Sequence, residues 1–262
     1  MARHICHVQW TSMNISKCIA ECKRAIPSFK INTMTLFVKT NLPSHINIMQ
    51  LRADMPTKHS TIFIKDSKNQ FPNCIIFKMH TNSHVVIKVF STGTFQITGA
   101  KNFYTASIAA SEMIRFVEGV LQLDHQPVKT EFVIHMINAS FFIGKNIKLE
   151  DMYSNVMGMN DPLIDVYSIT YEKTDHPAIN LKLRIATKPI TILLFRTGSI
   201  IITGVPGFQS MSDAFGLVLQ MLNKFQGCLY EKEIVDKSSI VPKKRGRKRK
   251  VESEAFYVSF NL

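Results

Sequence analysis

The sequence predicts an α+β fold with pseudo-twofold symmetry, in which two related halves join their strands into one broad, curved antiparallel sheet. The string F-S-T-G-T-F-Q-I-T-G, Phe90 to Gly99, recurs 105 residues later as F-R-T-G-S-I-I-I-T-G, Phe195 to Gly204. The same offset aligns Phe71-Pro72 with His176-Pro177. This period is too long for a solenoid unit and fits one small α/β half, so it indicates a tandem duplication.

Each half is expected to open with a strand and a short helix. The strands are predicted at residues 29–40 and 131–143, because both segments are rich in β-branched and aromatic side chains. The helices are predicted at 43–55 and 148–158, where apolar residues recur at spacings of three and four.

Four further strands are expected in each half, followed by a longer helix. In the first half the strands are 62–64, 74–79, 85–90 and one that ends at residue 99; in the second they are 166–169, 181–185, 190–195 and one that ends at 204. Turns at Gly93 and Gly198 connect the last two strands of each half. The whole sheet should therefore contain about ten strands.

Apolar stripes on the closing helices predict which face of the sheet is covered. The stripes consist of Met113, Phe116, Val117, Val120 and Leu121 in the first half, and Phe215, Val218, Leu222 and Phe225 in the second. Both face the core, so the helices should cover one face of the sheet and leave the other open. An uncovered sheet face typically binds a ligand.

These elements divide the chain into four segments. They are an N-terminal extension (1–28), a first repeat (29–126), a second repeat (127–230) and a basic C-terminal tail (231–262). The extension is expected to fold onto the first repeat.

Composition and charge point to a folded protein that binds a polyanion. The chain has 262 residues, of which 45% are hydrophobic, and a net charge of +13. Seven Lys and Arg residues lie in the segment from Lys243 to Lys250. The rest of the chain still carries a net charge of +6 and is therefore basic as well. Nucleic acid is the first candidate and an acidic membrane the second, but the tail lacks the apolar face that membrane binding requires. With no apolar run of membrane-span length and no signal peptide, a soluble intracellular protein is expected.

The cysteines and histidines give little support for a metal site or for catalysis. Five cysteines without framework spacing indicate reduced thiols in an intracellular setting. His4, Cys6, His7, Cys18 and Cys22 could supply zinc ligands, but their spacing matches no familiar finger. Paired carboxylates, a Ser–His–Asp set and a phosphate-binding loop are all missing, so we expect neither an enzyme nor a cofactor.

Three strings resemble the TATA-box-binding protein family over residues 29 to 228. V-I-K-V-F-S-T-G-T-F-Q-I-T-G-A-K (86–101) and I-L-L-F-R-T-G-S-I-I-I-T-G (192–204) are similar to the family's L-I-F-x-S-G-K-x-x-x-T-G-A-K, and Y-E-K-T-D-H-P-A (171–178) to Y-E-P-E-L-F-P-G. The tail and the extension resemble the family's members from large cytoplasmic DNA viruses of asfarvirus type. The resemblance implies a saddle-shaped monomer that binds AT-rich duplex DNA in the minor groove and bends it.

The resemblance also implies which side chains wedge between base steps. They are Phe71 with Phe90 at one end of the site, and His176 with Phe195 at the other. His176 stands where the family has phenylalanine. An imidazole is smaller and better hydrated than phenyl, so this kink should be weaker and should depend on pH near the histidine pKa of about 6.5.

Further groove and phosphate contacts follow from the same resemblance. The groove-floor candidates are Thr98, Thr203, Gln96, Ile201, Asn32 and Asn138. Ile97 and Ile202 alternate with the threonines and should point to the helices. The phosphate candidates are Lys78, Lys88, Lys101 and Arg184. Pro206 replaces the second repeat's lysine, which predicts a shallower salt dependence of binding.

The tail and the partner surface complete the expectations. The cationic tail residues are Lys243, Lys244, Arg245, Arg247, Lys248, Arg249 and Lys250. They fit an AT hook, a nuclear import signal or a nonspecific DNA-binding tail. Glu172 matches an acidic contact to a B-type initiation factor, which implies recruitment of RNA polymerase in a nucleus or a cytoplasmic virus factory. The alternative is a protein-interaction module whose DNA affinity resides in the tail.

Overall fold

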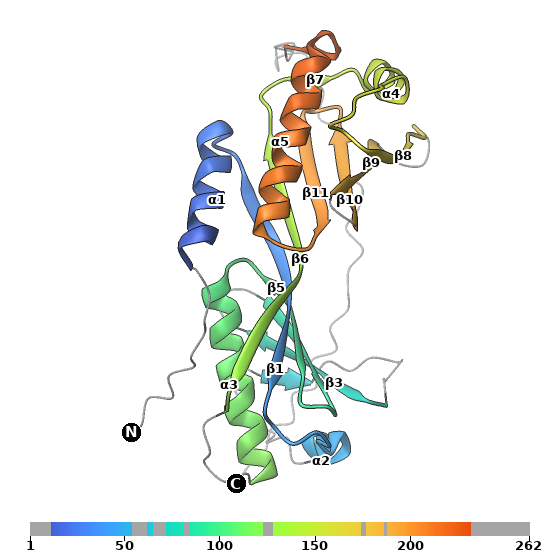
Figure 1. The fold of residues 1–262 in the computed structure, drawn as a ribbon. Helices are drawn as coiled ribbons and strands as arrows, with labels where there is room; N and C mark the ends of the chain where they lie inside the picture. The colour runs from blue at the N-terminus through green and yellow to red at the C-terminus, as the bar shows by residue number, and fades with distance from the viewer. Residues whose placement is uncertain are drawn as a thin grey trace, which may run out of the picture. The chain divides into compact units, whose positions relative to one another are not determined.

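A computed structural model describes residues 12–53, 62–64, 72–80, 84–122, 128–173, 177–185 and 188–231. Its main element is one ten-stranded antiparallel sheet in the order β2-β3-β4-β5-β1-β6-β11-β10-β9-β8 (Figure 1). The strands are β1 Lys30–Thr40, β2 Ile62–Ile64, β3 Cys74–His80, β4 His84–Phe90, β5 Phe95–Ala100, β6 Thr130–Phe142, β8 Val166–Thr170, β9 Ala178–Ile185, β10 Lys188–Phe195 and β11 Ser199–Val205. A separate two-stranded sheet pairs β7 Asn146–Ile147 with β12 Leu229–Tyr230.

The strand order is mirrored about the junction of β1 and β6. Outward from this pair, the first half continues with β5, β4, β3 and β2, and the second half continues with their counterparts β11, β10, β9 and β8. The two central strands pair from Lys30–Ser140 at one end to Thr40–Thr130 at the other. The predicted α+β fold, with a curved sheet of ten strands, is therefore confirmed.

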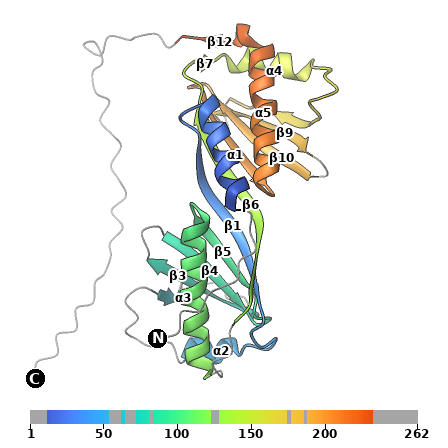
Figure 2. The same ribbon diagram turned by 60° about the vertical axis from the view of Figure 1, so that its left-hand side comes forward.

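Five α-helices and one 3-10 turn accompany the described strands. They are α1 Ser12–Ala25, α2 Ile48–Ala53, α3 Phe103–Leu121, α4 Leu149–Met157, α5 Phe208–Lys224 and η1 Gln226–Cys228. Figure 2 shows α3 and α5 lying along the two halves of the sheet. α2 begins later than expected because Asn47 caps its first turn: the Asn47 side chain accepts a hydrogen bond from the Gln50 backbone N–H at 3.0 Å.

Alternation along the strands separates a helix-covered face from an open face. Val85, Ile87 and Val89 of β4, and the equivalent Ile190, Ile192 and Leu194 of β10, are fully buried or nearly so. The residues between them are partly exposed. Because successive side chains of a strand point to opposite faces, the second set lies on the side away from α3 and α5. We call this side the open face.

The N-terminal helix does not pack where the sequence suggested. α1 contacts α5 of the second half instead of the first repeat. Cys18 and Cys22 of α1 are buried, and the Cys18 thiol donates to the Phe208 carbonyl oxygen at 3.2 Å. In the same core, Phe29, Phe141 and Phe215 form an aromatic cluster in which Phe215 meets each of the other two edge-on, at 5.2 and 5.0 Å between ring centroids.

The two β-turns that precede β5 and β11 require glycine. Gly93 and Gly198 adopt φ of 77° and 79°, a conformation that side chains with a Cβ rarely adopt. A Cβ on Gly198 would also clash with the Lys145 carbonyl oxygen. Gly93 N–H donates to Phe90 O at 3.0 Å and Gly198 N–H to Phe195 O at 2.9 Å, so each turn fixes the phenylalanine at its start.

Candidate nucleic-acid interface

Phe90 and Phe195 lie on the open face at equivalent positions in the two halves. Each ends a strand, pairs with the first residue of its neighbour (Cys74 for Phe90, Ala178 for Phe195), and is partly exposed. Neither phenylalanine is sealed beneath the helices. Their predicted neighbours Phe71 and His176 lie outside the described residues.

Asn138 forms the centre of the open face, beside the dyad of the sheet. Its side-chain N–H donates to Thr33 Oγ1 at 3.0 Å, and its oxygen accepts from the Thr203 hydroxyl and from the Gly204 backbone N–H. Asn138 and Thr33 are also partners across β1 and β6. These contacts fix the amide orientation and connect the two halves of the sheet.

Thr33, rather than Asn32, occupies the first-half position equivalent to Asn138. Asn32 lies at an irregularity in β1, where the register shifts, and accepts from the Ser140 hydroxyl at 3.0 Å. Thr33 was missed by the sequence reasoning, although it lies 105 residues before Asn138. The repeat offset was therefore the signal that could have found it.

The other predicted floor residues lie on the open face. Thr98 is exposed, whereas Thr203, Gln96 and Ile201 are partly exposed. Ile97 and Ile202, which separate them along the strands, are fully buried against the helices. The alternation predicted for β5 and β11 is thus observed.

Cations flank this floor in both halves. Lys78 and Lys101 are exposed and Lys88 is partly exposed. Lys182 on β9 was not predicted, yet it is the counterpart of Lys78, since Lys78 pairs with Val86 and Lys182 with the equivalent Thr191. Lys78 and Lys182 are 104 residues apart instead of 105, because β3 begins two residues after Pro72 whereas β9 begins only one residue after Pro177.

Arg184, the remaining predicted phosphate ligand, contacts the neighbouring edge strand. Its guanidinium lies 3.7 Å from the Asp165 carboxylate and 5.3 Å from the centroid of the Tyr167 ring. Both groups compete with a phosphate for this side chain. Lys182 is therefore the better placed cation of the second half.

The predicted partner contact, Glu172, is exposed just after β8. On either side of it, the Tyr171 and Tyr153 ring centroids lie 6.2 Å apart, and Lys173 Nζ lies 3.0 Å from Glu150 Oε1. The hydrogen bond from Lys173 lowers the pKa of the Glu150 carboxyl. The same surface includes a small pocket of about 240 Å³ that Lys148, Arg196 and Tyr230 help to line.

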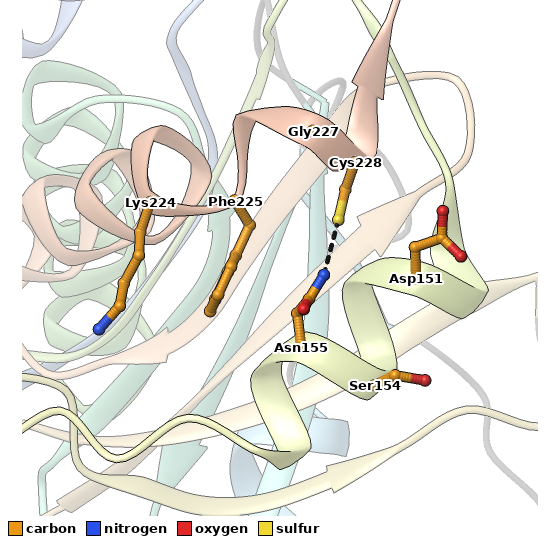
Figure 3. Close-up of a pocket in the computed structure, with 7 residues that line it drawn as sticks. All are labelled: Asp151, Ser154, Asn155, Lys224, Phe225, Gly227 and Cys228. Atoms are coloured by element: carbon orange, nitrogen blue, oxygen red, sulfur yellow. Dashed lines mark hydrogen bonds between the residues drawn. The ribbon is translucent and has the colours of Figure 1, made fainter.

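A larger pocket of about 480 Å³ lies between α4 and the C-terminal end of α5 (Figure 3). Asn155 donates to the buried Cys228 thiol at 3.1 Å, and Lys224 pairs with Asp161 at 2.7 Å. None of the predicted site residues lines this pocket. The Asn155, Cys228 and Lys224 side chains at this pocket are thus engaged in structural contacts.

Several expectations lie partly or wholly outside the described residues. His4, Cys6, His7 and the basic tail belong to this group, so nothing follows about their contacts. Within the described ranges, no cluster of three or more His, Cys, Asp or Glu side chains could hold a metal ion. No helix in the described part of the chain has the length and apolar character needed to span a bilayer.

Comparison with known proteins gives consistent matches. The family model described as Transcription factor TFIID (or TATA-binding protein, TBP) matches residues 28–120 and 131–225. A TATA-box-binding protein-like protein of Acanthamoeba polyphaga mimivirus is 24% identical over 66% of this chain and 55% of its own length. A TATA-box-binding protein of Caenorhabditis elegans is 27% identical over 53% of this chain and 36% of its own. The chain thus spans between about a third and about half of these curated relatives.

A solved structure shares the fold. The TATA-binding protein of Methanococcus jannaschii superposes with a TM-score of 0.57 at 20% sequence identity, covering 76% of this chain and 99% of the archaeal one. This likeness concerns the fold alone. The family match covers both halves of the sheet, including the turns at Gly93 and Gly198 and the central Asn138, and the chain is therefore a member of the TATA-binding protein family.

Proposed function

We propose that this protein is a transcription initiation factor that binds AT-rich duplex DNA through the minor groove and bends it. The observation that carries the proposal is the pair Phe90 and Phe195, which are partly exposed at equivalent ends of the open face of one continuous sheet. Family membership supports the same function.

In this mechanism the phenyl rings replace base–base stacking at two steps of the duplex. Unstacking costs a few kcal/mol per step, and the cost is offset because the bent duplex contacts more protein surface; TATA-binding proteins are the established case of this mechanism. The turns at Gly93 and Gly198 hold the backbone of both rings in place before DNA arrives. Such preorganisation lowers the entropy cost of binding.

The centre of the open face supplies the groove contacts. The Thr98 hydroxyl and the second amide N–H of Asn138 can donate to adenine N3 or thymine O2, the acceptors that A·T pairs show in the minor groove. The Thr203 hydroxyl would first have to leave the Asn138 oxygen, to which it donates. Asn32 lies beside them through its bond to Ser140. Lys78, Lys101 and Lys182 would contact phosphates, which provide affinity without sequence information. Lys88, predicted with them, instead pairs with Gln96 across β4 and β5 and would face the groove.

We further propose that the surface around Glu172 receives a B-type initiation factor, through which RNA polymerase is recruited. Glu172 is exposed, and its neighbours Tyr171 and Lys173 are held by Tyr153 and Glu150. The protein would act in a nucleus or in a cytoplasmic virus factory. The mimivirus relative supports the viral setting.

The test compares the sheet with the basic tail in the full-length chain. One variant replaces the seven tail Lys and Arg residues by Gln, and another replaces Phe90 and Phe195 by Ala. Affinity for a fluorescent AT-rich duplex is measured with and without a drug that fills the minor groove. We expect the tail variant to keep drug-sensitive binding and the phenylalanine variant to lose it. If all affinity disappears with the tail charges, the chain is a protein-interaction module with a DNA-binding tail, and the proposal fails.

A further inference from the structure

The open face is chemically different in the two halves, one row inward from each wedge phenylalanine. In the first half this row contains Lys88 and Gln96, which are partners across β4 and β5. In the second half the equivalent residues are Leu193 and Ile201, partners across β10 and β11. Lys88 and Leu193 each lie two residues before the phenylalanine of their strand.

The backbone fixes the direction of all four side chains. They are partly exposed, whereas their neighbours Val89, Ile97, Leu194 and Ile202 are fully buried on the helix side. Turning Lys88 or Gln96 toward the core would require a one-residue slip, which would bring the buried set to the surface. The polar row and the apolar row are thus stable features of the open face.

The two rows suit different base pairs. In the minor groove an A·T pair presents only acceptors, whereas a G·C pair adds the donor N2 amino group of guanine. Against Leu193 and Ile201 this amino group would lose water without gaining an acceptor, which is costly. The Gln96 side-chain oxygen can accept from it, while the Gln96 amide and the Lys88 ammonium can donate to the acceptors that every base pair shows.

We propose that the first half accepts G·C pairs next to its wedge step, whereas the second half requires A·T pairs. The ligand is then a directional duplex, with one strictly A·T end and one end of mixed composition. Gln96 is the specificity-determining residue, and Lys88 supports it. This inference rests on the proposed minor-groove function.

The test uses three duplexes of equal length: one entirely A·T, one with a G·C pair next to one wedge step, and one with a G·C pair next to both. Because the full-length chain can bind a duplex in either orientation, a single G·C pair should change its affinity by less than about twofold. G·C pairs at both ends should weaken binding on the order of tenfold, the usual cost of one unfavourable pair. Replacing these guanines by inosine, which lacks the N2 amino group, should restore the affinity.

Two reciprocal variants make the test specific. Lys88→Leu with Gln96→Ile gives the first half the chemistry of the second, so a single G·C pair should now cost about tenfold. Leu193→Lys with Ile201→Gln should instead remove the loss caused by G·C pairs at both ends. Circular dichroism checks that both variants fold, and the tail contributes equally to every duplex.

Equal tolerance or equal rejection of G·C by the two ends of the wild-type site would overturn the inference, as would reciprocal variants that leave the pattern unchanged. Failure of the proposed function has a different signature. In that case the all-A·T duplex would be bound no better than an all-G·C duplex and would not be bent.

Discussion

The first and second halves share strand order and turns, yet they differ on both sides of the sheet. On the open face, the first half has Lys88 and Gln96 where the second has Leu193 and Ile201. On the helix side, Ala110 of α3 is equivalent to Phe215 of α5, and α1 packs against α5 of the second half. Duplication thus supplies a symmetric frame, and these differences lie on the open face and beside the extra helix α1.

Substitutions on the helix side should change the free energy of unfolding, relative to the wild type, more than the other substitutions below. Phe215→Ala removes a ring packed against Phe29 and Phe141 and should cost about 3–5 kcal/mol. Ala110→Phe, the reverse change at the equivalent position, should cost about 1–3 kcal/mol through overpacking, because Ala110 is already buried. Urea unfolding followed by circular dichroism measures both. A neutral Ala110→Phe variant would mean that the two halves are packed alike.

Substitutions at the dyad of the open face should have the next largest effect, a loss of affinity for duplex DNA. Asn138→Asp would place a carboxylate at the centre of the open face, where on the proposed function it would repel phosphates and could not donate to base acceptors. Affinity for an AT-rich duplex should fall on the order of tenfold or more. Thr33→Asp should cause a similar loss, because Thr33 lies directly opposite Asn138. Titration of a labelled AT-rich duplex with each variant at fixed salt measures the affinity. A Thr33→Asp variant that binds as well as the wild type would show that the centre of the binding site lies elsewhere.

The flanking cations should behave alike in the two halves. Lys78→Ala and Lys182→Ala should each reduce the slope of log affinity against log salt by about 0.9, the value for one phosphate contact. Binding at several salt concentrations gives the slopes. A reduced slope for Lys78→Ala with an unchanged slope for Lys182→Ala would show that, of these two lysines, only the one in the first half contacts a DNA phosphate.

The smallest effect concerns an ion pair of the second half. The hydrogen bond from Lys224 lowers the pKa of Asp161. A lowered folded-state pKa stabilises the protein above the unfolded pKa, and the contribution is lost as the pH falls below about 4. Lys224→Met should therefore lower the thermal midpoint slightly at neutral pH and not in acid. Lys101→Met is the first-half control; an equal, pH-independent loss in both variants would contradict this account of the pair.

Much of the fold could be predicted from the sequence because the repeat fixes it twice. Each strand of one half has a counterpart at an offset close to 105 residues, although β3 and β9 depart from it by one. The alternation of Gln96, Ile97 and Thr98 identified the open face correctly. The wedge roles of Phe90 and Phe195 come from the family resemblance and stay predictions.

The features that the sequence did not reveal depend on long-range contacts or on small changes of register. Nothing local in α1 indicates that Cys18 would bond Phe208, which is 190 residues away. Thr33 was missed because the irregularity at Asn32 disturbs β1, and Lys182 because one residue fewer separates Pro177 from its strand. The errors at Thr33 and Lys182 are both shifts by one residue, and a shift of this size is enough to lose the pairing register of a strand.

The most direct test of the account measures the bend itself. An AT-rich duplex with a donor and an acceptor dye at its two ends is mixed with the full-length chain and with the Phe90→Ala, Phe195→Ala variant. The wild type should bring the dyes closer together, and the double variant should leave their distance close to that of free DNA. A double variant that bends the duplex as well as the wild type would contradict the wedge mechanism.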